Sequence, residues 1–505
     1  MKALFLIPPP ELNLRGIPID RVYGCNYGFD YKPPIHFLQV ATYAQDGLNW
    51  TIRFMDCPAE GIELNDWLNF DGWDYDVVCF WSTYLSAIED TRAARHILNQ
   101  FPQMKLIFMG TAATWKPEEF YLSENTFVLL GEMEHTLRDW SKAIQDSKPL
   151  TNIPGLGHFQ NGHFLRGPFR KLLDVTQLPL PDRSLLKGEY RANRLNRGPI
   201  TVMAVSRGCG FRCTFCTTNA IDQAVDLEFK RENPVFEDRP PLRKRTPEQV
   251  IEEFKQIAAL GYKSVEIADN IFTWGRSRTL QICRGIEELD LDWICLARAN
   301  MLHDPEVIQA MAKAGCKMVY MGSESFDDGL LDDMVKEIRV KDIIKAVDTC
   351  KANGLEPEVS VLIGGSAHEN WKTLLNSWWT ARKLGTEFVH YSVVLPSPST
   401  AMYDDAILNG WFIDGDFRPI DNAREVIVNL PNLSAKELQL AIKLAYGLQY
   451  LSPSGVWKQV KKVRSFNDIR HKASAARQLI GFLTDSEKVR TTTHIPAGRV
   501  TPLNG

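Results

Sequence analysis

The fold is decided by the segment TVMAVSRGCGFRCTFC, residues 201–216, in which three closely spaced cysteines follow an apolar run. The run Thr201–Ser206 predicts a buried β-strand, and a C-x3-C-x2-C pattern begins just beyond its carboxyl end. Three thiolates this close together can ligate three irons of a cubane cluster and leave the fourth iron open. Structural zinc prefers four closed ligands, and no fourth Cys or His adjoins these three. The spacing therefore predicts a [4Fe–4S] cluster held by Cys209, Cys213 and Cys216.

Strand and helix patterns continue to alternate downstream of the cysteines. The expected strands are Thr201–Ser206, Ser264–Ala268, Ile294–Ala297, Met318–Met321, Val359–Ile363 and Phe388–Val394. The expected helices between them include Pro247–Leu260, Pro305–Ala314 and Lys341–Asn353. Six such units predict a partial (β/α)6 barrel over residues 196–405, with its active site at the carboxyl ends of the strands.

A second alternating series lies upstream, over residues 1–150. Its expected strands are Ala3–Ile7, Thr51–Met55, Val77–Trp81, Lys105–Met109 and Thr126–Leu130. Short apolar strands separated by helices predict an α/β domain with a Rossmann-like, doubly wound parallel sheet. Ligands of such sheets bind outside the carboxyl ends of the strands.

Two further segments complete the expected organisation. Residues 151–195 are rich in Gly and Pro and lack periodicity, so we expect a linker over the surface. Residues 406–505 are expected to form a small, mainly helical segment and a tail. Ser434 and Glu437 have the spacing of a capping box before an amphipathic run to about Leu451.

Composition excludes several classes of protein. The net charge of −4 argues against a general nucleic-acid binder, which usually has a basic face. No apolar stretch reaches the length of about 18 residues that a membrane span requires. The N-terminus resembles a buried strand more than a signal peptide. Seven of the ten cysteines are scattered singly, so we expect free thiols and a cytoplasmic protein.

The barrel segment resembles the radical SAM superfamily, whose enzymes cleave S-adenosylmethionine (SAM) reductively. The similar segments are Val265–Asn270, Leu296–Asn300, Tyr320–Ser325, Ile363–Glu369 and Leu395–Tyr403, which occur in the family's order after the cysteines. The fifth lacks the usual proline, and Ser399 replaces a common glycine in the sixth. The resemblance implies SAM contacts from Phe215, Asp269, Arg298, Ser323 and Glu324.

The N-terminal segment resembles the cobalamin-binding domain that precedes many radical SAM barrels. The matching residues lie at Asp56–Gly61, Ser82–Tyr84, Gly110–Thr111 and Gly131–Glu134. Pro58 stands where related cobalamin domains have a histidine, so we expect no histidine on cobalt. The resemblance implies cobalamin contacts from Pro9, Asp56, Gly61, Ser82, Tyr84, Gly110, Thr111, Gly131 and Glu132.

Both cofactors together imply a methyltransferase that acts on an unactivated carbon of a small molecule or natural product. A 5′-deoxyadenosyl radical would abstract hydrogen, and methylcobalamin would supply the methyl group. An oxidative cyclase or ring rearrangement enzyme with the same cofactors stays open, as does a non-catalytic iron–sulfur scaffold or sensor. We also expect an electron donor such as flavodoxin or ferredoxin as a partner. The sequence does not identify the substrate.

Overall fold

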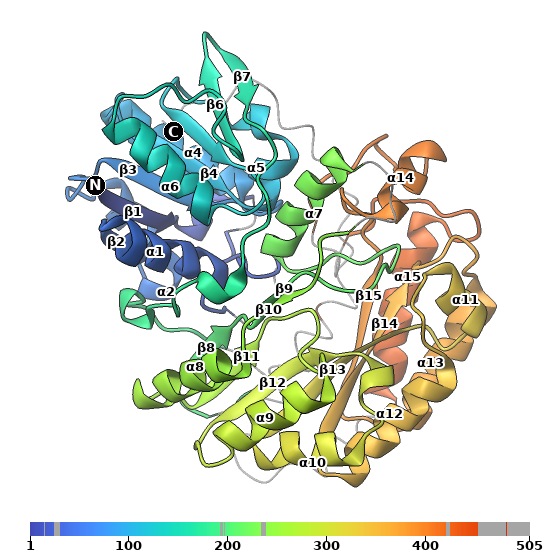
Figure 1. Ribbon diagram of the computed structural model, residues 1–505. Coiled ribbons are helices and arrows are strands. Elements are labelled where there is room, and N and C mark those ends of the chain that lie inside the picture. Colours follow the sequence, from blue (N-terminus) through green and yellow to red (C-terminus); the bar gives the residue numbers. More distant parts are fainter. Residues whose placement is uncertain are drawn as a thin grey trace.

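The structure is a computed structural model that describes residues 1–14, 16–24, 31–191, 195, 197–233, 239–420, 425–452 and 481. Two large sheets organise these residues (Figure 1). One sheet belongs to the first third of the chain, and the other begins near residue 200. The prediction of two successive α/β units is confirmed.

Five parallel strands form the centre of the N-terminal sheet, in the order β2-β1-β3-β4-β5. They are β1 Lys2–Ile7, β2 Thr51–Asp56, β3 Val77–Trp81, β4 Lys105–Met109 and β5 Thr126–Leu129. Alternate side chains enter two different cores, since Phe5 and Trp81 lie on one face and Leu6 and Phe80 on the other. Burial on both faces is what defines a doubly wound sheet.

Helices cover both faces of this sheet. On one face α1 and α6 pack against each other, and on the other α4 supplies part of the core. The helices of this unit are α1 Ile35–Leu48, α2 Cys57–Glu60, α3 Leu64–Leu68, α4 Ala87–Gln100, α5 Thr111–Trp115 and α6 Glu134–Gln145, with 3-10 turns η1 Pro10–Leu12 and η2 Pro117–Phe120.

The stretch expected to be a linker contains an antiparallel hairpin. β6 (Leu156–Gln160) pairs with β5, and β7 (His163–Arg166) pairs with β6, so the N-terminal sheet has seven strands (Figure 1). Two 3-10 turns follow, η3 Val175–Gln177 and η4 Arg183–Leu185. Val175 and Arg183 are buried, so this part of the segment does not simply run over the surface. The expected domain boundaries themselves stay predictions.

The second sheet has all six expected strands, paired in parallel in the order β15-β14-β13-β12-β11-β8. They are β8 Ile200–Met203, β11 Ser264–Ile267, β12 Asp292–Ala297, β13 Cys316–Glu324, β14 Glu356–Ile363 and β15 Val389–Val393. A short antiparallel pair, β9 Ser206–Arg207 and β10 Arg243–Lys244, adjoins the first strand. The partial (β/α)6 barrel is therefore confirmed.

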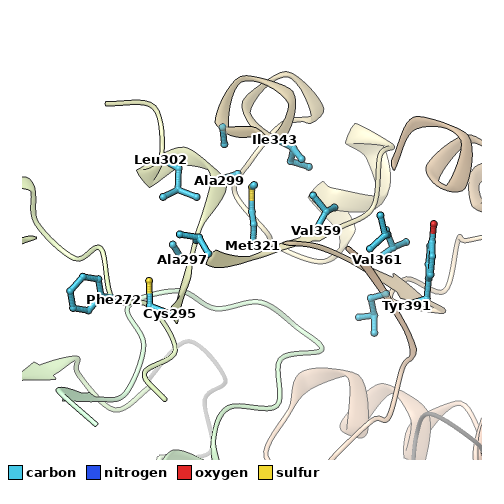
Figure 2. Close-up of a cluster of buried hydrophobic side chains, with 14 of the residues drawn as sticks. Phe272, Cys295, Ala297, Ala299, Leu302, Met321, Ile343, Val359, Val361 and Tyr391 are labelled. Atoms are coloured by element: carbon cyan, nitrogen blue, oxygen red, sulfur yellow. The ribbon is translucent and has the colours of Figure 1, made fainter. Parts of the chain in front are cut away.

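The outer face of the barrel strands packs on the surrounding helices. Figure 2 shows this core, to which Cys295, Met321, Val359 and Tyr391 contribute from successive strands. The helices are α7 Ala220–Glu232, α8 Pro247–Ala259, α9 Arg276–Ile286, α10 Pro305–Lys313, α11 Asp328–Asp333, α12 Val340–Ala352 and α13 Trp371–Leu384, with the 3-10 turn η5 Ala299–Met301. Helix α7 also packs on α5, which joins the barrel to the N-terminal unit.

The described C-terminal part is helical. It contains α14 Ala401–Leu408, α15 Ala435–Tyr446 and the π-helical turn η6 Gly447–Leu451. Ser434 and Glu437 form the predicted capping box at the start of α15. The tail expected beyond residue 485 lies outside the described residues. Within the described part of the chain, no helix has the length and apolar character to cross a membrane.

Candidate functional site

The three cysteines lie in a loop that starts directly after β9. Gly208 opens this loop with φ +85°, and a Cβ there would lie 2.9 Å from the carbonyl oxygen of Pro241. Only glycine avoids both the strain and the collision. The loop is held further on, because the Thr214 amide donates to the Met334 carbonyl at 3.0 Å and Arg239 Nη2 donates to the Cys213 carbonyl at 3.2 Å.

The thiols of this loop are close enough to influence one another. Burial raises the pKa of Cys216 to about 12, and the charges of the Cys213 and Cys209 thiolates add to that rise. No three His, Cys, Asp or Glu side chains of the described residues gather tightly enough for a single metal ion. The thiolates of a cubane cluster can lie farther apart than the ligands of a single ion, because each thiolate ligates a different iron. Three neighbouring thiols in one loop fit a cluster better than a lone ion.

Arg298, at the end of β12, reaches the cysteine loop. Its Nη1 lies 3.6 Å from Cys213 Sγ, within hydrogen-bonding range of sulfur. Its guanidinium carbon lies 3.4 Å from the centroid of the Phe211 ring, which stacks in turn on Trp274 at 5.2 Å. The residue expected to contact SAM thus lies beside a cysteine sulfur and stacks on Phe211, which is itself supported by Trp274.

A buried ion pair lies next to the same loop. Lys336 Nζ donates to Glu324 Oε1 at 2.8 Å and lies 5.6 Å from the Phe215 ring centroid. Glu324 has φ +64°, a conformation that non-glycine residues adopt only when their surroundings enforce it. Phe215, Arg298 and Glu324 therefore all lie beside Lys336 at one edge of the barrel, and their contact with SAM stays a prediction. Lys336 gave no signal in the sequence, since it follows α11 in an irregular segment.

The other two expected SAM residues have different surroundings. Asp269 accepts hydrogen bonds from the Val205 amide at 2.7 Å and from Ser206 Oγ at 2.5 Å, so it fixes the end of the first barrel strand. Ser323 is fully buried, and its hydroxyl has no hydrogen-bond partner among the described residues. An orphaned buried hydroxyl at the end of β13 suits a polar ligand such as SAM.

Several expected cobalamin residues are engaged by the protein itself. Asp56 accepts hydrogen bonds from Tyr31 at 2.6 Å and from Tyr190 at 3.0 Å. Ser82 Oγ donates to Asp90 at 2.7 Å. Burial raises the pKa of Asp56 to about 6, against the opposing effect of the two tyrosine hydroxyls. No motif in the sequence pointed to these tyrosine partners.

The remaining expected contacts divide into backbone positions and engaged side chains. Gly61, with φ +68°, ends α2, and Pro9 precedes η1. A Cβ at Gly110 would lie 2.8 Å from the Ser82 carbonyl oxygen. A Cβ at Gly131 would lie 3.2 Å from the Glu228 side chain. These glycines allow close packing within the protein, whatever ligand the sheet binds.

Three larger side chains complete this set. Thr111 Oγ1 donates to the Ala220 carbonyl at 3.0 Å and so ties α5 to α7. Tyr84 is surrounded by Trp115 and Phe417, and its buried hydroxyl has no partner among the described residues. Glu132 binds two arginines of the barrel segment.

Residues 203–377 match the Radical SAM superfamily. The matched range includes all three cysteines together with Arg298 and Glu324. The chain carries a radical SAM domain. The predicted enzyme class, a radical SAM enzyme, is therefore confirmed.

Relatives of this radical SAM enzyme extend the likeness beyond the barrel. An uncharacterized methyltransferase of Pyrococcus horikoshii is 26% identical over 475 residues, which cover 92% of this chain and 96% of the relative. The fold resembles that of OxsB, a cobalamin-dependent SAM radical enzyme, with a TM-score of 0.68 at 14% identity over 94% of this chain and 70% of OxsB. It also resembles the radical SAM methyltransferase TsrM of Kitasatospora setae, with a TM-score of 0.59 at 17% identity over 81% of this chain and 75% of TsrM.

Proposed function

We propose that this radical SAM enzyme is a cobalamin-dependent methyltransferase that acts on an unactivated carbon of a small molecule or natural product. One observation carries the proposal: the chain is similar over nearly its whole length to a methyltransferase. The OxsB structure holds aqua-cobalamin and SAM, and the TsrM structure holds cobalamin and a [4Fe–4S] cluster. We assign the same three cofactors to this chain.

The barrel supplies the residues that would hold the cluster and SAM. Cys209, Cys213 and Cys216 are the cluster ligands, and the bound cluster supplies the electron for reductive cleavage of SAM. Lys336 and Glu324 present a cation and an anion beside the cysteine loop. They suit the carboxylate and amino groups of SAM, because charge-assisted hydrogen bonds to both groups fix their orientation.

The N-terminal unit supplies the cobalamin site in this proposal. Bound cobalamin contributes a cobalt centre that carries the methyl group. Pro58 has no side-chain donor for cobalt, and Asp56 and Ser82 are already bonded within the protein. We therefore propose that the backbone and the shape of the sheet edge hold the cofactor, with no protein imidazole on the metal.

Product analysis tests the proposal without knowledge of the substrate. The anaerobic protein, loaded with cobalamin and reconstituted with iron and sulfide, is mixed with SAM and a strong reductant. A methyltransferase forms S-adenosylhomocysteine by methyl transfer to reduced cobalamin and 5′-deoxyadenosine at the cluster. Replacement of all three cysteines by Ala should remove 5′-deoxyadenosine and leave S-adenosylhomocysteine. Release of 5′-deoxyadenosine alone from the wild type would contradict methyl transfer and favour a cyclase or a rearrangement enzyme.

The proposal also includes the partners of the enzyme. Reductive cleavage requires an external electron, so we propose a flavodoxin or a ferredoxin as donor in the cytoplasm. The net charge of −4 supports a small-molecule substrate over a nucleic acid. Kinetics with purified flavodoxin in place of the chemical reductant would test the donor.

A further inference from the structure

Arg207 lies two residues before Cys209 and is bound by acidic residues of the N-terminal unit. Its Nη1 lies 3.0 Å from Glu132 Oε1 and 3.3 Å from Glu134 Oε2. Its Nη2 donates to the other oxygen of Glu134. All three side chains are at least 95% buried. The arginine at the start of the cysteine loop is therefore held from the opposite unit of the chain.

A second arginine completes the arrangement. Arg243 faces Arg207 across the β9–β10 pair, and its Nη1 lies 2.7 and 2.8 Å from the two oxygens of Glu132. Glu132 also accepts a hydrogen bond from the Leu173 amide at 2.9 Å. Two cations and two anions balance one another, and a balanced set of buried charges tolerates the loss of a member poorly. We call Arg207, Arg243, Glu132 and Glu134 the arginine clamp.

We propose that the arginine clamp positions the cluster loop from the N-terminal unit and so fixes the cluster relative to the cobalamin site. Glu132 was expected to contact cobalamin. In this proposal it helps to position the cysteine loop through Arg207 and Arg243. The proposal rests on the proposed function, because it requires Cys209, Cys213 and Cys216 to hold the cluster.

The path from the clamp to the first cysteine is short and stiff. Gly208 alone separates Arg207 from Cys209, and its left-handed backbone is blocked on one side by the Pro241 carbonyl. Its amide donates to Asp222 Oδ1 at 2.8 Å. A shift of the Arg207 guanidinium is thus transmitted to Cys209 with little opportunity for the backbone to absorb it. Glu132 lies in the short turn between β5 and α6, and Glu134 is the first residue of α6, so the position of Arg207 depends on the end of the N-terminal sheet.

The chain provides a matched control for the loss of a buried charge. Glu253 of α8 is fully buried and also binds two arginines, Arg183 at 2.6 Å and Arg245 at 2.8 Å. Among the described residues, its side chain hydrogen-bonds to these two arginines and not to the clamp or the cysteine loop. Glu134→Gln and Glu253→Gln therefore each remove one buried carboxylate that is paired with arginine, and only Glu134 binds Arg207 directly.

The experiment uses the full-length holoenzyme, with iron, sulfide and cobalt measured in every variant. The readout is the electron paramagnetic resonance spectrum of the reduced cluster before and after addition of SAM. In Glu134→Gln and Arg207→Lys we expect a weakened SAM-induced spectral change and at least a 10-fold slower formation of 5′-deoxyadenosine. Glu253→Gln should keep the wild-type spectrum and rate. Glu132→Gln, which leaves the Glu134 contact in place, serves if Glu134→Gln does not fold.

The outcomes separate the clamp from the proposed function. If the clamp variants and Glu253→Gln lose the same thermal stability and all keep the wild-type spectrum and rate, the clamp is structural only and the inference is wrong. If the wild type itself shows no SAM-induced change, the proposed function fails first. A larger loss of rate in Glu134→Gln than in Glu253→Gln at equal cluster content supports the positioning role.

Discussion

The carboxyl ends of the two sheets differ in how their polar side chains are used. At the N-terminal sheet Asp56 and Ser82 are bonded to other side chains of the protein. At the barrel sheet Arg298 contacts a cysteine sulfur, and the buried hydroxyl of Ser323 has no partner among the described residues. Arg298 and Ser323 of the barrel thus keep polar groups beside the cysteine loop or without a partner among the described residues, whereas Asp56 and Ser82 of the N-terminal sheet hold the protein together.

This difference has a physical consequence for cofactor binding. A cluster and SAM need charged or nucleophilic side chains, and the barrel edge offers thiols, an ammonium and a carboxylate. A large corrinoid can be held by its shape and by backbone groups. An N-terminal site can then lack a side-chain ligand for the metal and still bind its cofactor. The predictions below test this contrast, from the largest effect to the smallest.

The largest effect is expected for Gly110→Ala. The new Cβ would lie 2.8 Å from the Ser82 carbonyl oxygen, in a backbone conformation with φ +100°. Strain and collision together should cost about 3 kcal/mol of unfolding free energy, measured by urea denaturation without cobalamin. Gly61→Ala is the control, since φ is +68° and no atom lies within 4 Å, so only about 1 kcal/mol is expected. Unchanged stability with lost cobalamin binding would assign Gly110 to the cofactor.

Asp56→Asn tests the same sheet through its pH dependence. The pKa of Asp56 is raised to about 6 by burial, above its usual value of 3.8. A raised pKa means that the native state favours the protonated form, so this contribution to stability is lost as pH rises through about 6. Between pH 4 and pH 7 the wild type should lose up to about 3 kcal/mol relative to the variant. Parallel stability curves for the two proteins would refute the internal role of this carboxyl group.

Arg298→Gln tests the barrel edge. The substitution removes a positive charge and a donor 3.6 Å from Cys213 Sγ, and both stabilise a more negative cluster. The reduction potential should fall, and reductive cleavage of SAM should slow about 10-fold, which is about 1.4 kcal/mol. Phe211→Leu, which removes only the stacking partner, should have a smaller effect on the potential. An unchanged potential in Arg298→Gln would place the arginine outside the electrostatic reach of the cluster.

The smallest effect is expected for Ser399→Gly, after the sixth barrel strand. Ser399 has φ +86°, a strained conformation for a residue with a side chain, and its hydroxyl makes no side-chain hydrogen bond among the described residues. Glycine relieves this strain and should stabilise the fold by up to about 1 kcal/mol. SAM cleavage should stay at the wild-type rate. A destabilised variant would show that the serine side chain has a role at this strand end.

The sequence predicted the regular parts of the fold well. Each barrel strand is an apolar run bounded by polar or helix-forming residues, so local periodicity was sufficient. The β6–β7 hairpin was missed because Gly157 and His163 interrupt the alternation of a strand only 4 or 5 residues long. The hairpin is ordered by its hydrogen bonds to β5 and not by a periodic pattern of its own.

The candidate site was predictable only where its residues lie close together in the sequence. The cysteine spacing defines three ligands within one loop. Lys336 and Glu324 meet across a helix, and Tyr190 reaches Asp56 from 134 residues away. The arginine clamp joins Arg207 to Glu132 across 75 residues. Such contacts depend on how separate segments of the chain pack, which no local pattern encodes.

Metal analysis of the wild type and of the triple Cys209→Ala, Cys213→Ala, Cys216→Ala variant tests the central claim most directly. Both proteins are purified anaerobically, reconstituted with iron, sulfide and cobalamin, and freed of unbound cofactor. We predict about four irons and one cobalt per wild-type chain, and cobalt without iron in the variant. Wild-type iron content in the variant would contradict a cluster held by these three cysteines. A wild type that binds no cobalt would contradict a cobalamin site in the N-terminal unit.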